Sequence, residues 1–265
     1  MPPTLNPSKA RPGAGGAGAR LVRLMQAVAE AEGDAPLKAL AGRLKLPAST
    51  VHRLLQILID ADLLERAPND AYRPGREFFR LSSLMLRKFD YVQRARPTLE
   101  DLWKRWQETC SFCLYKPGNK TALVVDTVRT PHPLQFVLEP LSEIPLVWGS
   151  LGRSILAFLP ADEIDAALAK AEIGPLSGRP APSRVKMREE LQRIRQRRCA
   201  VYEDRAQLNL AGVAAPVFGP DRRVLGSLGV TMPASRFKPA DQERLTSSVI
   251  ESAAQLSDVF GFPGT

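Results

Sequence analysis

The chain has 265 residues, which exceeds a typical single domain and allows two modest hydrophobic cores. Its net charge of +9 and its sequence pI near 9.8 favour polyanionic partners such as nucleic acid. No apolar run is long enough for a membrane span, and the first residues lack the apolar segment of a signal peptide. These properties predict a cytoplasmic protein.

Residues 1–17 form a leader of unusual composition. They are mostly Pro, Gly and Ala, with Lys9 and Arg11 and no acidic residue. Such a segment cannot bury enough apolar surface to fold, so a disordered basic leader is predicted. A basic arm that follows DNA phosphates is the alternative for the same residues.

Residues 18–76 predict three helices and a hairpin. Residues 21–28, 37–44 and 51–58 each carry apolar side chains at i, i+3, i+4 and i+7, the spacing of one buried helix face. Only residues 45–47 connect the second helix to the third, and Pro47 suits a first helical turn. Two helices joined by such a short turn form a helix-turn-helix.

The third of these helices has an outward face of hydrogen-bonding side chains. They are Ser49, Thr50, His52, Arg53 and Gln56. Side chains of this kind reach base edges and phosphates from a helix in the major groove. Downstream, two short extended runs, 63–66 and 71–74, bracket a turn-rich tip, so the unit is predicted to be a winged helix-turn-helix.

Several segments together resemble one family, the IclR-type transcriptional regulators. They are Leu46-Pro47-Ala48-Ser49-Thr50-Val51-His52-Arg53-Leu54-Leu55, Tyr72-Arg73-Pro74-Gly75, Arg94-Ala95-Arg96-Pro97-Thr98-Leu99, Gly152-Arg153-Ser154-Ile155-Leu156-Ala157-Phe158-Leu159-Pro160 and Ala214-Ala215-Pro216-Val217-Phe218. The resemblance implies a DNA-binding regulator controlled by a small-molecule effector. It also implies a homodimer, or a dimer of dimers, on double-stranded operator DNA.

Residues 77–91 are predicted to form a helix that links the two domains. Phe78, Phe79, Leu84 and Met85 give it more apolar surface than a solitary helix would expose. We therefore expect this linker helix to pack against its twin in a dimer.

Residues 92–262 are predicted to be an α+β domain, so the whole chain belongs to a mixed α/β class. The expected strands are residues 112–115, 122–127, 134–138, 213–218 and 224–232, and the expected helices include 161–170, 183–198 and 239–260. Mixed helices and strands around one sheet resemble the family's GAF-like effector-binding and oligomerisation domain.

Nothing in the sequence favours an enzyme. The two histidines, His52 and His132, have no paired acid that would mark a general base. Cys110 and Cys113 have CxxC spacing, but zinc would need further ligands, and in a strand the two side chains point to opposite faces. No phosphate-binding loop or nucleophile motif occurs, so we expect no metal, no cofactor and no catalytic site.

The family's DNA-binding roles carry over onto nine positions. They are Lys38, Arg43, Ser49, Thr50, His52, Arg53, Gln56, Tyr72 and Arg73. Arg53 is the first candidate, because its fork can pair with guanine O6 and N7. The alternative for Arg53 is an ion pair with Asp60 or Glu65, and for His52 it is packing against the wing.

The family's effector pocket carries over onto ten positions. They are Trp148, Gly149, Ser150, Leu151, Asp204, Arg205, Asn209, Gly212, Gly229 and Thr231. Gly212 and Gly229 replace small polar residues that are common in the family, while Trp148 and Arg205 are unusual additions. These changes predict a roomier pocket for an aromatic carboxylate paired with Arg205. The alternative is that Arg205 is a solvated loop residue.

Two other functions stay open at this point. The second domain could serve only for dimerisation, without an effector. The chain could also be a small-molecule enzyme that carries a vestigial helix-turn-helix.

Overall fold

The computed structural model describes residues 16–86, 90–136, 138–171, 173–174 and 177–264. The chain divides into two compact units, with the boundary between residues 89 and 90. The leader predicted over residues 1–17 lies almost wholly outside the described residues, and Ala17 already belongs to the first helix.

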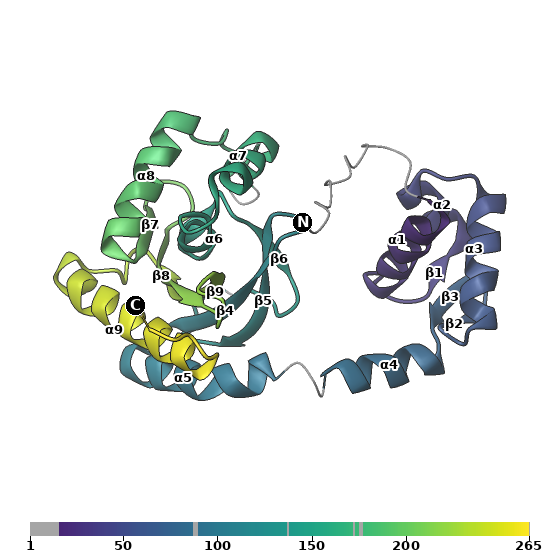
Figure 1. The fold of residues 1–265 in the computed structure, drawn as a ribbon, viewed down its shortest axis with the longest axis horizontal. Coiled ribbons are helices and arrows are strands. Elements are labelled where there is room, and N and C mark those ends of the chain that lie inside the picture. Colours follow the sequence, from purple (N-terminus) through teal and green to yellow (C-terminus); the bar gives the residue numbers. More distant parts are fainter. Residues whose placement is uncertain (1–15, 87–89, 137, 172, 175–176, 265) are drawn as a thin grey trace, which may run out of the picture. The chain divides into compact units, whose positions relative to one another are not determined.

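The first unit packs three helices against a small sheet (Figure 1). Its elements are α1 (Ala17–Ala29), β1 (Ala35–Pro36), α2 (Leu37–Leu44), α3 (Ala48–Asp60), β2 (Leu64–Ala67) and β3 (Ala71–Pro74). The three strands are antiparallel in the order β1-β3-β2. The predicted apolar stripes meet in one core, in which Leu24, Val51 and Leu55 are almost completely buried.

Two short turns give this unit its shape. Lys45 adopts a left-handed conformation between α2 and α3, and the Leu46 amide donates to the Ala41 carbonyl at 3.1 Å. Pro47 is the N-cap of α3, so the helix begins one residue later than expected. At the end of the wing, a side chain on Gly75 would meet the Asp62 carbonyl oxygen at 2.4 Å. The glycine that closes the wing is therefore required by close backbone approach.

The helix that follows the wing is shorter than predicted. α4 spans Arg76–Leu86, residues 87–89 lie outside the described residues, and α5 begins at Tyr91. Phe79 is 74% exposed and Met85 is 59% exposed. The apolar surface expected on this helix is therefore present in the single chain.

The second unit is built on one antiparallel sheet of six strands in the order β6-β5-β4-β9-β8-β7. The strands are β4 (Thr109–Lys116), β5 (Thr121–Val128), β6 (Glu143–Pro145), β7 (Ala200–Asp204), β8 (Leu210–Phe218) and β9 (Val224–Pro233). The helices are α5 (Tyr91–Trp106), α6 (Gly149–Leu156), α7 (Ala161–Lys170), α8 (Arg184–Arg197) and α9 (Pro239–Val259). The chain is thus a mixed α/β protein, as predicted.

Helices cover both faces of this sheet (Figure 1). Leu102 of α5 and Val249 of α9 share a core with the sheet residues Phe112 and Leu228. On the other face, α6, α7 and α8 form a second core with Cys113 and Val124. Burial on both faces explains why β4, β8 and β9 read as nearly continuous runs of small and apolar residues.

One predicted strand is wrong. The described residues of the stretch 134–138, which exclude 137, contain no strand, and the sheet edge is instead β6 at Glu143–Pro145. Pro131 and Pro133 precede this stretch and have no N–H for a ladder. Two side chains bind its carbonyls instead. Arg236 donates to the Leu134 oxygen at 3.0 Å and Thr127 to the Leu138 oxygen at 3.1 Å.

The cysteines are core residues. Cys110 and Cys113 lie in β4 on opposite faces of the sheet, one in each core, as their spacing predicts. Burial raises the pKa of Cys113 to about 12 and that of Cys199 also to about 12. Among the described residues no group of His, Cys, Asp or Glu could hold a metal, and no helix is long and apolar enough to cross a membrane.

Candidate functional site

At Ser49, His52 and Arg53, the outward face of α3 makes no side-chain hydrogen bond or ion pair with another described residue. Ser49, His52 and Arg53 are exposed, while Val51 and Leu55 of the same helix are buried. Within the described part of the chain, the Arg53 guanidinium has no hydrogen-bond or ion-pair partner. The two acids considered as its partners are engaged elsewhere, because Asp60 accepts from Gln56 at 2.7 Å and Glu65 pairs with Arg73 at 2.6 Å.

Other predicted DNA-contacting residues fall into two groups. Thr50 is half-buried on α3, and Lys38 is exposed on α2 without an ion pair to a described residue. Gln56, Arg43 and Arg73 are held by neighbours, since Gln56 also accepts from Arg66 at 3.1 Å and Arg43 pairs with Glu30. These last three side chains would have to exchange partners to reach a phosphate.

Tyr72 does not lie on the surface that was predicted to contact DNA. It is only 4% exposed and belongs to the core of the first unit. Its place in β3 opposite Ala35 turns it inward, so it supports the wing from below and offers almost no surface to DNA.

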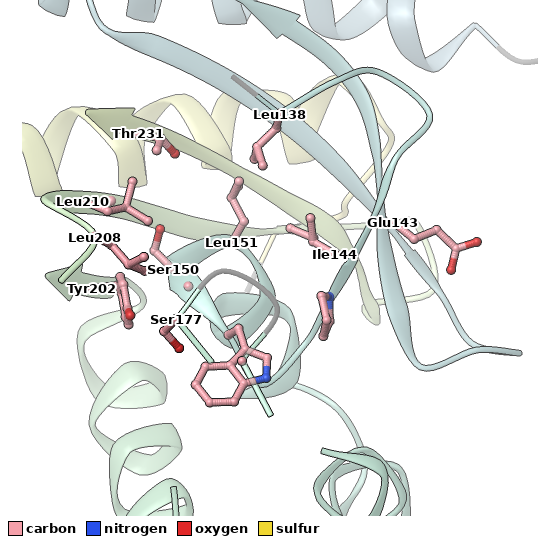
Figure 2. A pocket seen from close by; sticks show the side chains of 15 residues that line it. Leu138, Glu143, Ile144, Ser150, Leu151, Ser177, Tyr202, Leu208, Leu210 and Thr231 are labelled. Carbon is pink, nitrogen blue, oxygen red and sulfur yellow. The ribbon is translucent and has the colours of Figure 1, made fainter. Parts of the chain in front are cut away.

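The second unit contains an apolar cavity of about 340 Å³. It is lined by residues of β6, α6, β7, β8 and β9 and of the loops between them: Leu138, Glu143, Ile144, Pro145, Trp148, Gly149, Ser150, Leu151, Gly174, Ser177, Tyr202, Leu208, Leu210, Gly212 and Thr231. Figure 2 shows Ser150 and Leu151 of α6 beside Leu210 of β8. Six of the predicted effector-binding positions meet here: Trp148, Gly149, Ser150, Leu151, Gly212 and Thr231.

The start of α6 forms the polar end of the cavity. Trp148 is the N-cap, and no side chain caps the helix. The first N–H groups of a helix have no intrahelical acceptor and carry partial positive charge. The described lining residues include no Lys, Arg or His. The helix amides, the hydroxyls and the Trp148 indole N–H are therefore donors available to a ligand in this cavity.

Close backbone approach explains the glycines of this region. A side chain on Gly152 would meet the Pro145 and Leu146 carbonyl oxygens at 2.6 and 2.8 Å, so glycine lets α6 lie against the preceding turn. A side chain on Gly174 would lie 3.0 Å from the Trp148 indole, so glycine leaves room for that ring in the cavity wall. At Gly212, an added carbon would stand 2.6 Å from the Ser150 hydroxyl.

Four predicted effector-binding residues do not line the cavity. Asp204 is buried beside it, and hydrogen bonds from the Gln207 and Leu208 amides, together with Arg179, hold its pKa below the usual range. Asp204 therefore positions the loop that carries Leu208.

Arg205, Asn209 and Gly229 also lie outside the lining of the cavity. Arg205 is 54% exposed, pairs with Glu203 and donates to the Phe237 carbonyl at 3.0 Å, so its position gives no support to a carboxylate contact. Asn209 is exposed and accepts from the Ser235 amide at 3.2 Å. A side chain on Gly229 would meet the Val213 oxygen at 2.6 Å, so its absence permits strand packing and adds no room to the cavity.

The lining residues that were not predicted from sequence come partly from strands and partly from irregular segments. Leu210 lies two positions before Gly212 in β8, so strand alternation was a usable signal for it. Leu138, Gly174 and Ser177 belong to irregular segments in which no periodicity exists to follow. Tyr202 could have been found only by expecting β7, which the sequence analysis did not predict.

Charged groups lie at the mouth of the cavity and behind its wall. Glu143 is exposed at the mouth, and donors from Lys116, Thr121 and Asn119 hold the pKa of its carboxyl low. Behind the wall, Arg153 of α6 donates to the Val147 carbonyl at 3.0 Å and lies over the Tyr202 ring at 5.3 Å. Burial lowers the pKa of Arg153.

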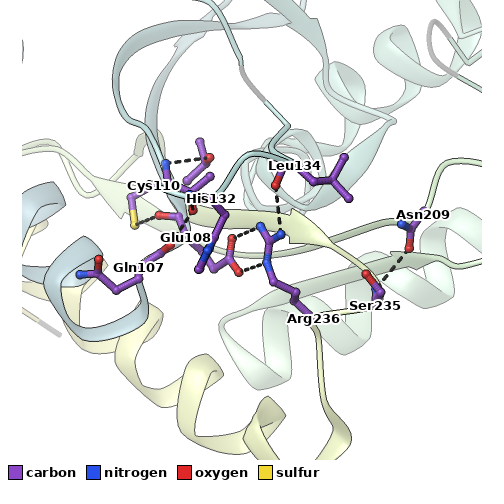
Figure 3. A network of polar contacts seen from close by, with 10 residues as sticks. Gln107, Glu108, Cys110, His132, Leu134, Asn209, Ser235 and Arg236 are labelled. Carbon is purple, nitrogen blue, oxygen red and sulfur yellow. Dashed lines mark hydrogen bonds and ion pairs between the residues drawn. The ribbon is translucent and has the colours of Figure 1, made fainter.

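A polar network fastens the loops on one side of the domain (Figure 3). The buried Glu108 carboxylate accepts two hydrogen bonds from Arg236, at 2.5 and 2.7 Å. Arg236 also holds the Leu134 carbonyl, and Thr130 donates to the Gln107 carbonyl at 2.6 Å. The segment that leads to Leu138 is thereby tied to the turn before α9.

Comparison with known proteins places both units in one family. The family description "IclR helix-turn-helix domain" matches residues 19–68, and "Bacterial transcriptional regulator IclR C-terminal" matches residues 83–258. The HTH-type transcriptional regulator KipR of Bacillus subtilis is 25% identical over 217 residues, which are 82% of this chain and 86% of the relative.

Two solved structures show the same fold. An IclR transcriptional regulator from a Silicibacter species superposes with a TM-score of 0.82 at 21% identity, covering 94% of this chain and 98% of the other. An IclR homologue from Microbacterium hydrocarbonoxydans, complexed with 4-hydroxybenzoate, gives 0.73 at 18% identity, covering 92% and 98%. The chain belongs to the IclR family of bacterial transcriptional regulators, with an N-terminal DNA-binding helix-turn-helix domain and a C-terminal effector-binding domain.

Proposed function

We propose that α3 enters the major groove and that Arg53 makes its main contact to a base. The support is the exposed, unpaired guanidinium on a helix whose opposite face is buried. Ser49, Thr50 and His52 flank it on the same helix and offer short donors and acceptors to base edges and phosphates. Lys38 on α2 is proposed as a phosphate contact. In this role the chain acts on DNA in the cytoplasm and needs no catalytic activity of its own.

We propose that the chain acts as a homodimer, or a dimer of dimers, through the apolar surface of α4. Phe79, Leu84 and Met85 are exposed in the single chain, and several large apolar side chains exposed on one short helix are typical of an interface. A dimer presents two recognition helices to half-sites about 34 Å apart or a multiple of that distance.

Sedimentation of the full chain tests the interface. Phe79→Glu should shift the protein toward monomer, because the dimer would bury an unpaired charge. Val185→Glu, at an exposed apolar residue of α8, is the matched control and should leave the assembly unchanged. An unchanged mass for Phe79→Glu would remove α4 from the interface.

We propose that the effector is an aromatic carboxylate, held with its ring against Trp148 and Tyr202 and its carboxylate at the start of α6. One observation carries the proposal: an apolar cavity of about 340 Å³ ends at an uncapped helix N-terminus beside the Ser150 hydroxyl. Helix amides bind anions at this position. The relative from Microbacterium, whose structure contains 4-hydroxybenzoate, supports the same class of ligand.

Titration calorimetry with 4-hydroxybenzoate and its neutral amide, 4-hydroxybenzamide, tests this proposal. The carboxylate should bind roughly 10-fold more tightly, the size of one charge-assisted hydrogen bond. Leu210→Trp should abolish binding by filling the cavity, whereas Val185→Trp on exposed α8 should not. Arg205→Ala should leave the affinity unchanged.

Two results would overturn the effector proposal. Equal affinity for acid and amide would remove the anion contact at α6. No binding of any aromatic acid to a folded wild-type protein would favour a second domain that serves only for assembly.

A further inference from the structure

A second hollow lies at the opposite ends of elements that line the effector cavity. It has a volume of about 490 Å³ and is formed by the turn after α6, the turn after α8, the end of β8, the β8–β9 turn, α9 and the segment after α9. Leu210 of β8 lines the effector cavity, and Phe218 at the end of the same strand lines this groove.

The floor of the groove is aromatic. Phe218 lies between Phe158 and Phe262, with ring centroids 5.3 and 5.4 Å apart. All three rings are only half-buried, and Ile250 adds an aliphatic surface from α9. Three partly exposed aromatic rings in one concave surface suit a flat or branched apolar group.

The rim of the groove is positively charged. Arg198 and Arg222 line it, and neither guanidinium has a hydrogen-bond or ion-pair partner among the residues that the structure describes. Most other arginines of this unit are paired, as are Arg129 with Glu139 and Arg188 with Asp165. Asp258 is the one described acid in the lining, so two guanidinium groups face one carboxylate.

We propose that this groove is a second small-molecule site, for a carboxylate with an apolar body. The aromatic floor would take the apolar body, and Arg198 and Arg222 would take the carboxylate. An arginine fork suits this ion, since it can donate two parallel hydrogen bonds. A ligand there would touch the end of β8 and the turn after α6, while the opposite ends of β8 and α6 line the effector cavity. The site is distinct from that cavity and does not depend on which effector binds there.

The test uses 3-phenylpropionate as probe and its neutral amide, 3-phenylpropanamide, as the comparison ligand. Calorimetry is performed on full-length Leu208→Trp, in which the effector cavity is filled from its rim, so that remaining binding reports the groove. We expect one molecule of the acid per chain and about 10-fold weaker binding of the amide. Should Leu208→Trp fail to fold, the measurement is repeated on the wild-type protein, in which Arg198→Ala and Arg222→Ala distinguish binding in the groove from binding in the first cavity.

Variants of the rim residues distinguish a contact to the carboxylate from a purely structural role. Arg198→Ala and Arg222→Ala should each weaken the acid about 10-fold and leave the amide unchanged. Asp258→Asn should strengthen the acid about 2- to 5-fold, because it removes a like charge. Arg184→Ala, which removes an exposed unpaired arginine at the start of α8, is the matched control and should change neither.

The second site would be overturned if folded Leu208→Trp binds no acid and the wild type binds the acid only in the effector cavity. Binding that Arg198→Ala and Arg222→Ala do not weaken would overturn it equally. Neither result would affect the first cavity, which Leu210→Trp and 4-hydroxybenzoate test separately.

Discussion

The recognition helix and the effector cavity are built in different ways. α3 carries both its buried stripe and its outward face on 13 consecutive residues, and its neighbours only support it. The cavity is formed by β6, α6, β7, β8, β9 and the loops between them. Its shape depends on close approach of a backbone at Gly152 and of the Trp148 side chain at Gly174. The DNA-reading surface should therefore tolerate local change, and the cavity should not.

The strongest effect should come from Gly→Ala at the cavity, compared with the same substitution in α2, the helix that supports α3. Gly152→Ala places a carbon 2.6 Å from a backbone oxygen and should destabilise the second unit by about 3 kcal/mol, the upper part of the overpacking range. Gly42→Ala in α2 meets nothing within 4 Å and should be neutral or stabilise by up to about 1 kcal/mol. Thermal unfolding measures the stability change of each variant. Equal changes in the two would contradict the expected difference.

Arg53→Ala should have the next largest effect, on DNA affinity alone. Loss of a bidentate base contact costs about 1–3 kcal/mol, which is roughly 5- to 150-fold in Kd, and should relax sequence preference at one position. Fluorescence anisotropy with the DNA upstream of its own gene measures the loss. Arg193→Ala in α8 is the charge-matched control, and a uniform loss across all DNA sequences would make Arg53 a phosphate contact instead.

Trp148→Leu should weaken the aromatic effector by about 1 kcal/mol, roughly fivefold, because a ring contact is lost while the apolar wall remains. DNA affinity without effector should not change. Calorimetry with 4-hydroxybenzoate gives the first value and anisotropy the second. Equal binding by wild type and Trp148→Leu would place the ligand away from that wall.

The smallest effect is expected for Lys38→Ala. A phosphate contact contributes equally on all sequences, so the variant should bind DNA modestly more weakly and lower the slope of log affinity against log salt by about 1. The measurement is a salt titration. A slope equal to that of wild type would show that Lys38 does not reach a phosphate.

The same difference between regions explains what the sequence could reveal. The apolar stripes of α1, α2 and α3 were predicted correctly, because helix periodicity is local and Val51, Leu54 and Leu55 obey it. A helix was predicted to begin at residue 183, and Ser183 caps α8 by accepting from the Lys186 amide at 3.4 Å. Both cases rest on residues within one turn of each other.

Predictions failed where distant contacts decide the role of a residue. Arg205 has the charge to bind a carboxylate, but the Phe237 carbonyl and Glu203 hold it elsewhere. Tyr72 looks like a wing residue able to reach DNA, yet the pairing of β3 with β1 buries it. Leu138 and Ser177 enter the cavity from irregular segments, and their position depends on tertiary packing that no pattern in the chain records.

We propose that a ligand in the cavity beside α6 sets the DNA affinity of α3. The most direct test is the Kd for upstream DNA with and without saturating 4-hydroxybenzoate, for wild type and for Leu210→Trp. We predict a change of roughly 5- to 150-fold in wild type, the usual size of a coupling of 1–3 kcal/mol, and none in Leu210→Trp. An unchanged Kd in wild type that binds the acid, or the same change in both proteins, would contradict the account.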